Sequence, residues 1–187
     1  MLGAMHTWFN VRKAAQVVAF FAREEGGSIN VLKLSKLVYL ADRTNMRLHD
    51  FPISSDKLVS MDHGPVNSIT LNYVNGFAGG REGWEEFVTD RANYRVGLTR
   101  AVTDDQLDEL SAAELATLKA VWQQFGAMDQ YAIRDWTHIN CKEWEDPDGS
   151  STPIPYERVF KFLGKENAEE LAFQVECERA QRAALRA

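Results

Sequence analysis

The stretch Ser28-Ile-Asn-Val-Leu-Lys-Leu-Ser-Lys-Leu-Val-Tyr-Leu-Ala-Asp42 is the longest strongly apolar helical pattern in this chain of 187 residues. At 100° per residue, Leu34 and Leu37 fall on one broad face of the helix, and Tyr39 lies well outside that face. A helix that is apolar on more than one side is typical of the centre of a domain. The pattern therefore predicts a mainly α fold around a central buried helix at about 28–47.

The same helix carries a row of basic residues at alternating three- and four-residue steps, with a leucine in the middle. The row consists of Lys33, Lys36, Leu40, Arg43 and Arg47. One interpretation is that the aliphatic stems cover apolar surface while the charges reach water. The other is that an exposed leucine ringed by cations forms a docking strip for an acidic partner. These five residues are the sequence's candidates for partner binding.

The composition is that of a globular protein, with 45% hydrophobic residues and no linker rich in proline, glycine or serine. Such a chain is long enough to bury one core, so we expect a single domain over 1–187. The formal charge of −6 argues against direct binding of nucleic acid, which prefers a basic surface.

Cysteine usage and hydropathy bear on the compartment. Cys141 and Cys177 are too few for a disulfide scaffold and have no CxxC spacing, which fits a reducing cytoplasm. No apolar run reaches transmembrane length, and the N-terminus lacks the pattern of a signal peptide. The expectation is a cytoplasmic protein without a membrane partner.

Helical spacing and capping signals extend beyond the central stretch. Further helices are expected at 9–25, 66–75, 111–125 and about 129–138, followed by a C-terminal helical extension at about 156–186. The segments 84–89 and 94–98 are instead rich in β-branched and aromatic residues, and the polar segment between them suits a turn. We therefore expect one small β-hairpin at about 84–98.

No catalytic motif stands out. The chain has neither a nucleophile elbow nor a phosphate-binding glycine loop. His138 and Cys141 are three residues apart, as two metal ligands on one helix face would be, but no second pair has a suitable spacing. His63 and His138 are therefore interpreted as structural, with no metal and no cofactor, in a protein that is not an enzyme. The alternative is a metal-dependent hydrolase, which would need these histidines in one pocket with carboxylates.

Three segments, taken in order, resemble a known family. They are Leu32-Lys-Leu-Ser-Lys-Leu-Val-Tyr-Leu-Ala-Asp42, Met61-Asp-His-Gly-Pro-Val-Asn-Ser68, and Leu110-Ser-Ala-Ala-Glu114 continued through Phe125-Gly126 to Asp135-Trp-Thr-His138 and Trp144. Together they are similar to the Panacea domain, also called the SocA-like antitoxin domain, over about 9–145. The chain departs from the family pattern at His63, where many relatives have an aromatic residue.

The resemblance implies a mostly helical antitoxin that neutralises a toxin encoded nearby by direct binding. One family member acts instead as a proteolytic adaptor, so the alternative is delivery of a bound protein to a protease. Homo-oligomerisation is left open. The residues that carry the resemblance also have structural interpretations in the core, in a turn or at a helix end. They are Leu34, Leu37, Tyr39, Asp42, His63, Gly64, Pro65, Val66, Thr137, His138 and Trp144.

Overall fold

The computed structural model describes residues 6–185, which contain seven α-helices, five short strands and one 3₁₀ helix. The elements in chain order are α1 (Val11–Glu24), β1 (Ser28–Asn30), α2 (Val31–His49), β2 (Leu58–Met61), β3 (Gly64–Asn67), α3 (Ser68–Val74), β4 (Arg95–Gly97), η1 (Asp104–Gln106), α4 (Ala112–Phe125), α5 (Gln130–Asn140), β5 (Thr152–Pro153), α6 (Tyr156–Phe162) and α7 (Ala168–Leu185). The predicted mainly α class is confirmed. The outermost ends of the predicted 1–187 range lie outside the described residues.

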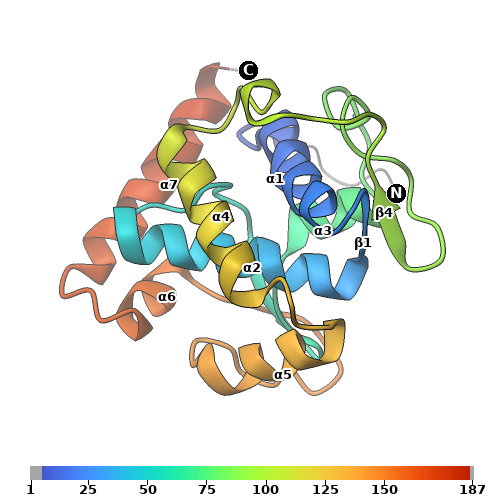
Figure 1. The fold of residues 1–187 in the computed structure, drawn as a ribbon. Coiled ribbons are helices and arrows are strands. Elements are labelled where there is room, and N and C mark those ends of the chain that lie inside the picture. Colours follow the sequence, from blue (N-terminus) through green and yellow to red (C-terminus); the bar gives the residue numbers. More distant parts are fainter. Residues whose placement is uncertain (1–5, 186–187) are drawn as a thin grey trace.

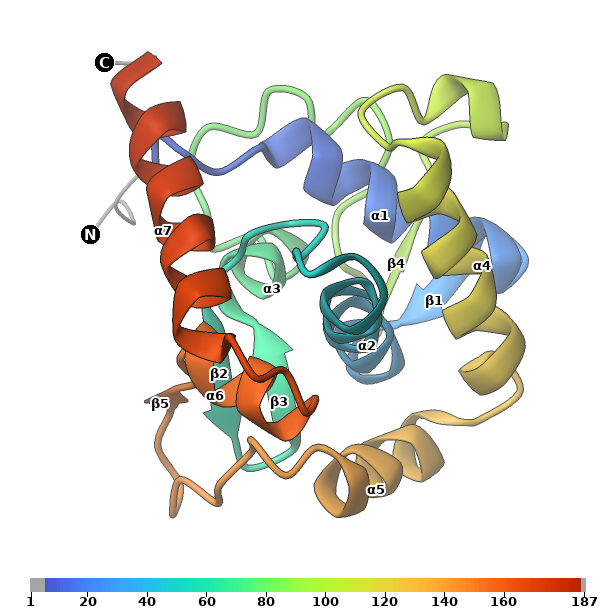
Figure 2. The same cartoon turned by 90° about the vertical axis from the view of Figure 1, so that its left-hand side faces the viewer.

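Helix α2 runs through the middle of the molecule, and α1, α4, α5 and β3 pack around it (Figure 1, Figure 2). Twelve of its nineteen residues are buried, which confirms the predicted central helix. The helix begins three residues later than expected, because the preceding residues form β1. Asn30 ends that strand, and its side chain accepts hydrogen bonds from the backbone N–H groups of Leu32 and Lys33 at 2.9 and 3.2 Å. This capping fixes the start of the helix.

The β-hairpin expected at about 84–98 forms only in part. Isolated antiparallel bridges join Val88 to Leu98 and Ala92 to Arg95, but the ladder of the second arm is made with another strand. Strand β4 pairs antiparallel with β1, and Val96 lies opposite Ile29. The first predicted arm forms turns instead of a strand. The reason is that Trp84 and Phe87 are both fully buried, whereas residues three apart in a strand would point to opposite faces.

A second sheet has the strand order β3-β2-β5, with Val59 opposite Val66 in an antiparallel register. The predicted turn at His63-Gly64-Pro65 is present, but it joins β2 to β3 and does not open a helix. Helix α3 begins only at Ser68. Its free N–H groups at Ile69 and Thr70 donate to the buried carboxylate of Asp56 at 2.9 and 2.8 Å. The side chain of a distant loop residue therefore caps this helix.

The C-terminal helices α6 and α7 pack against each other on the far side of α2 from β1 (Figure 2). Helix α7 buries Ala168, Leu171, Val175 and Arg179, a stripe at three- and four-residue steps. The Arg179 guanidinium donates to the backbone carbonyls of Ser55 and Asp56, so α7 is anchored to the loop before β2. This helix is therefore docked from Ala168 to Arg179, whereas the residues after Arg179 are exposed or only partly buried.

Candidate functional site

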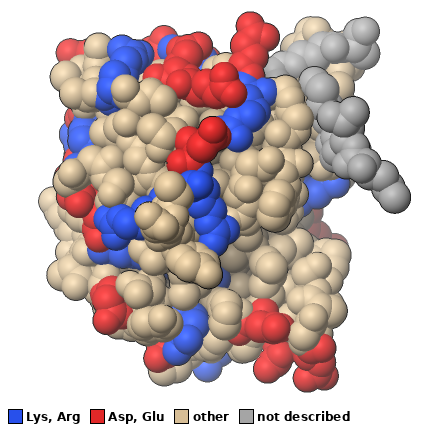
Figure 3. Space-filling model, turned by 90° about the vertical axis from the view of Figure 1, so that its right-hand side faces the viewer, with Lys and Arg blue, Asp and Glu red and all other residues tan. Residues whose placement is uncertain are grey.

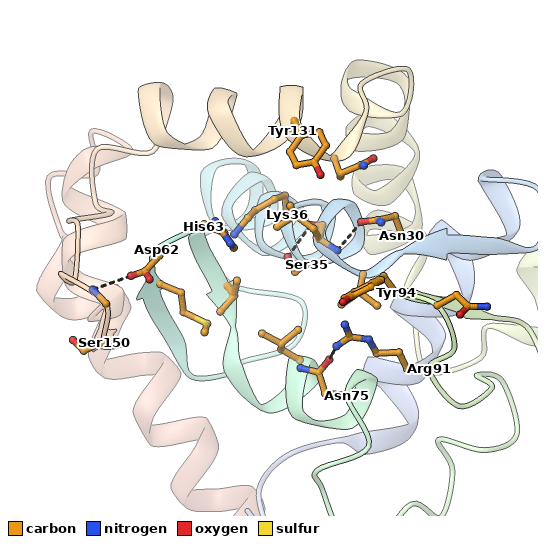
Figure 4. Close-up of a pocket in the computed structure, with 18 residues that line it drawn as sticks. Asn30, Ser35, Lys36, Asp62, His63, Asn75, Arg91, Tyr94, Tyr131 and Ser150 are labelled. Carbon is orange, nitrogen blue, oxygen red and sulfur yellow. Dashed lines mark hydrogen bonds between the residues drawn. The ribbon is translucent and has the colours of Figure 1, made fainter.

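A pocket with a volume of about 720 Å³ opens beside the first turns of α2. Figure 4 shows the elements that line it: the start of α2, the tip of the β2–β3 hairpin, α3, the start of α5, and the loops around residues 91–94 and 149–150. These segments are far apart in the sequence, and the packing of the hairpin and α5 against α2 brings them together. We call this hollow the Lys36 pocket, after the residue at its back.

Lys36 extends from α2 towards His63 at the hairpin tip (Figure 4). Its side chain is fully buried, and its Nζ donates one hydrogen bond, to the Pro65 carbonyl at 2.9 Å. No carboxylate within residues 6–185 lies within ion-pair distance of this Nζ. Burial therefore lowers the pKa of Lys36 to about 7.

The groups near Lys36 do not neutralise it. Cys141 is a buried thiol whose pKa burial raises to about 12, so it carries no charge at neutral pH. Arg134 adds a second positive charge and further lowers the pKa of Lys36. The pKa of His138 is lowered first by burial and then by the charges of Lys36 and Arg134. Arg134 is itself paired with Asp135 at 2.6 Å, so the back of the pocket holds one buried lysine to which residues 6–185 give no carboxylate partner.

Two tyrosines form the rim of the pocket. Tyr94 and Tyr131 are 72% and 56% exposed, and guanidinium groups lie over both rings. Arg91 stacks on Tyr94 and donates to the Asn75 side chain across the mouth (Figure 4). On the face that includes β1 and β4, basic side chains lie near the middle, with uncharged surface on both sides and acidic side chains directly beside them (Figure 3). Exposed tyrosines beside cations are typical of protein-binding surfaces.

The basic row predicted on α2 does not form an exposed surface, and this prediction is wrong. Lys33, Lys36 and Leu40 are buried, with exposures of 5%, 0% and 2%. Arg43 is partly buried, and only Arg47 is exposed. The physical reason is that neighbouring elements pack against the side of α2 that carries the row, whereas the partly exposed residues of its first turns, Leu32 and Ser35, line the pocket.

The buried members of the row have separate roles. Lys33 donates to Glu25 and to the Gly126 carbonyl, and it lies over the Trp122 ring, which ties α2 to the ends of α1 and α4. Arg43 donates to the buried carboxylate of Glu143 at 2.6 Å. Among the five residues, Lys36 alone lines the pocket.

Glu143 links the central helix to the segment after α5. Its carboxylate is fully buried and accepts from the Tyr39 hydroxyl at 2.8 Å as well as from Arg43. Burial, followed by the neighbouring Glu143 charge, raises the pKa of Tyr39, so the hydroxyl keeps its proton and donates. Asp42, one turn along α2, accepts from the backbone N–H groups of Ile53 and Ser54 at 2.9 Å. These carboxylates hold loops in place and lie outside the pocket.

The family-like residues after the central helix also meet in one place. His138 stacks on Trp144 with ring centroids 4.2 Å apart, and the Trp144 indole donates to the Met61 carbonyl at 3.0 Å. Gly64 packs directly against Thr137 and His138. His63 at the hairpin tip is exposed, whereas Thr137 is fully buried. This cluster fixes the hairpin that closes one side of the Lys36 pocket.

Gly64→Ala is expected to destabilise the protein by roughly 2 to 4 kcal/mol. Gly64 has φ +94°, and an added Cβ would lie 2.9 Å from Thr137 Oγ1 and 3.1 Å from His138 Cδ2. Gly164→Ala is the matched control, since Gly164 has φ +77° but no atom within 4 Å of the new Cβ. The control should lose only about 1 kcal/mol from backbone strain. Equal losses in denaturant unfolding would show that close packing at Gly64 contributes nothing.

Residues 6–185 contain neither a metal-ligating cluster nor a helix that could span a membrane. No group of three or more His, Cys, Asp or Glu side chains in this range is arranged to hold a metal ion. Cys141 and Cys177 are free thiols. None of the helices in this part of the chain combines the length and apolarity needed to cross a membrane.

The residues that make the pocket were largely missed by sequence reasoning. Tyr94 and Arg91 were assigned to the expected hairpin, and Tyr131 was one position on an expected helix. The only available signal was that Tyr131 falls on the face of that helix opposite the buried Ile133.

The fold and the pocket define a mainly α domain with an open hollow at one end of its central helix. In a comparison with protein families, residues 34–145 match the family described as antitoxin SocA-like, Panacea domain. The match spans more than half of the chain, and the chain belongs to this family. The match begins at residue 34, within α2, whereas the predicted family-like region began near residue 9. Comparisons with curated proteins and with solved structures found no match.

Proposed function

We propose that this protein is an antitoxin that neutralises a toxin, encoded by an adjacent gene, through direct protein–protein contact. Membership of the SocA-like antitoxin family supports this function most strongly. In this proposal the chain acts in the cytoplasm, where the toxin is made, and has no catalytic activity of its own.

We further propose that the face around the Lys36 pocket contacts the toxin. This face combines two exposed tyrosines with basic side chains and an open hollow, which suits a binding centre with a charged rim. Most of the elements that line the hollow lie within the matched range of 34–145.

Expression of the adjacent gene, alone and together with this chain, tests the function. The adjacent gene alone should arrest growth, and co-expression should restore it. Absence of arrest, or arrest that co-expression does not relieve, would reject the antitoxin function.

A proteolytic adaptor is the alternative, since it also binds a protein. The two functions are separated by mixing the purified chain and toxin without a protease. An antitoxin inhibits the toxin under these conditions. An adaptor leaves the toxin active and lowers its amount only in cells that contain the protease.

Tyr131→Ala is expected to weaken binding of the toxin at least tenfold, because a rim tyrosine in a binding centre supplies large contact area at low entropic cost. Its side chain is exposed, so the melting temperature should stay close to that of the wild type. Phe173→Ala is the matched control, because Phe173 is an aromatic residue on α7, outside the pocket, and is 67% exposed. Calorimetry or surface binding assays measure both variants. Similar affinities for the two variants would place the contact elsewhere.

A further inference from the structure

Most buried charged groups of this protein have several specific partners. Asp42 accepts from two backbone N–H groups and from the Asn67 side chain. Asp56 accepts from two backbone N–H groups and from the Thr70 hydroxyl. Arg179 donates to two carbonyls and also pairs with Glu176. Their desolvation is compensated by hydrogen bonds inside the fold.

Lys36 differs from all of these groups. An ammonium has three N–H donors, but the described residues give Lys36 Nζ a single neutral acceptor, the Pro65 carbonyl. The charged groups that act on it are positive or weakly acidic, namely Arg134, His138 and the neutral thiol Cys141. A buried ammonium without a counter-ion is costly. Its position at the back of an open pocket places the missing anion inside that pocket.

We propose that the Lys36 pocket receives a carboxylate carried by a segment of the partner toxin, an aspartate or glutamate side chain or the chain end, which pairs with Lys36 Nζ. The inference rests on the proposed function and adds to it the chemistry of the contact. The segment enters between Tyr94 and Tyr131, whose rings supply its apolar walls. Lys36 is fully buried, so the proposal requires a side chain at the back of the pocket, such as exposed His63 at the hairpin tip (Figure 4), to move aside when the carboxylate enters.

Charge complementarity favours a carboxylate over other occupants. The protein as a whole has a charge of −6, so its general field does not attract anions. Attraction must therefore be local. The pocket lining supplies it through Lys36 and Arg91, against one lining carboxylate, the exposed Asp62, which accepts from the Gly149 N–H. A volume of about 720 Å³ accommodates a few side chains of a bound segment and is larger than a lone carboxylate group needs.

The first experiment measures the affinity of the purified chain for the toxin in the Lys36→Met variant. Methionine keeps the apolar stem and removes the charge, so we expect at least a tenfold loss of affinity with a melting temperature that is equal or higher. Lys142→Met, at an exposed lysine outside the pocket, is the control and should bind like the wild type. Binding of Lys36→Met within twofold of wild type would overturn the proposal.

The second experiment uses the wild-type chain and needs neither the toxin nor a variant that folds. The ¹³Cε signal of Lys36 is followed by NMR during titration with 3-phenylpropanoate and, separately, with the neutral 3-phenylpropanamide. The carboxylate should shift the signal in a saturable manner and the amide should not. If both compounds or neither shift the signal, the carboxylate site is overturned. If co-expression rejects the antitoxin function while the carboxylate still shifts Lys36, the toxin as source is overturned and the carboxylate site stands.

Discussion

Replacing Glu143 by alanine is expected to lower the free energy of unfolding by about 3 to 5 kcal/mol, the range for removing one member of a buried charged pair. The Glu143 carboxylate is fully buried and is the acceptor for both the Tyr39 hydroxyl and Arg43 Nε. Its loss leaves a fully buried hydroxyl and a partly buried guanidinium on the central helix without their acceptor. The measurement is urea or guanidinium unfolding near pH 7.

Two further variants separate the causes of this loss. Glu143→Gln keeps one oxygen acceptor and removes the charge, so it should be destabilised less than Glu143→Ala. Glu145→Ala removes a carboxylate two residues later whose side chain is 70% exposed in its pair with Arg158. That control should change stability by less than about 0.5 kcal/mol. A Glu143→Ala protein as stable as the Glu145→Ala protein would show that the buried pair does not hold this segment to α2.

The central helix could be predicted because its signal is local and redundant. Apolar residues on more than one side of one long segment indicate a central helix, and the observed helix covers nearly the predicted range but begins three residues later. The short strands could not be predicted in the same way. β1 and β4 are three residues long and are separated by more than sixty residues, so their pairing is decided by tertiary packing.

The basic row on α2 shows why the site was harder to predict than the fold. Spacing correctly placed Lys33, Lys36 and Arg43 along one helix, but it contained no information about the neighbours of that helix. The pattern predicts that the charged groups of Lys33 and Lys36 reach solvent. Both side chains are buried instead, and only Lys36 lines a pocket. The rim tyrosines come from segments whose proximity depends on how α5 and the 91–94 loop pack, which periodicity does not reveal.

Lys36 combines a cost for the fold with a proposed benefit for binding. A buried, unpaired ammonium weakens the isolated protein, and residues that break a local packing rule in this way are expected at functional sites. The same charge gains a partner when a carboxylate enters the pocket. Removal of the charge should therefore change stability and affinity in opposite directions, a combination that a purely structural lysine would not give.

Lys36→Met is expected to stabilise the isolated protein by roughly 1 to 4 kcal/mol near pH 7, as apolar replacement of buried charges often does. The gain should also depend on pH. An ordinary lysine keeps its proton up to a pKa of 10.5, whereas the pKa of Lys36 in the folded protein is about 7. Between these two values the unfolded chain binds more protons than the folded chain, so the stability of the wild type rises with pH. Below pH 7 Lys36 is protonated in both the folded and the unfolded chain, so the folded protein bears the full cost of burying the ammonium.

The difference in unfolding free energy between Lys36→Met and the wild type should consequently be largest at pH 7 and below and shrink steadily towards pH 10. Subtracting the two unfolding free energies cancels the contribution of groups that titrate in both proteins, such as the Cys141 thiol with its raised pKa. Lys142→Met provides the control, because an exposed lysine should give a small difference at every pH. Urea unfolding at pH 6.5, 8 and 9.5 is sufficient. A constant difference across this range, or a variant less stable than the wild type at pH 6.5, would show that Lys36 is not a buried charge without a counter-ion.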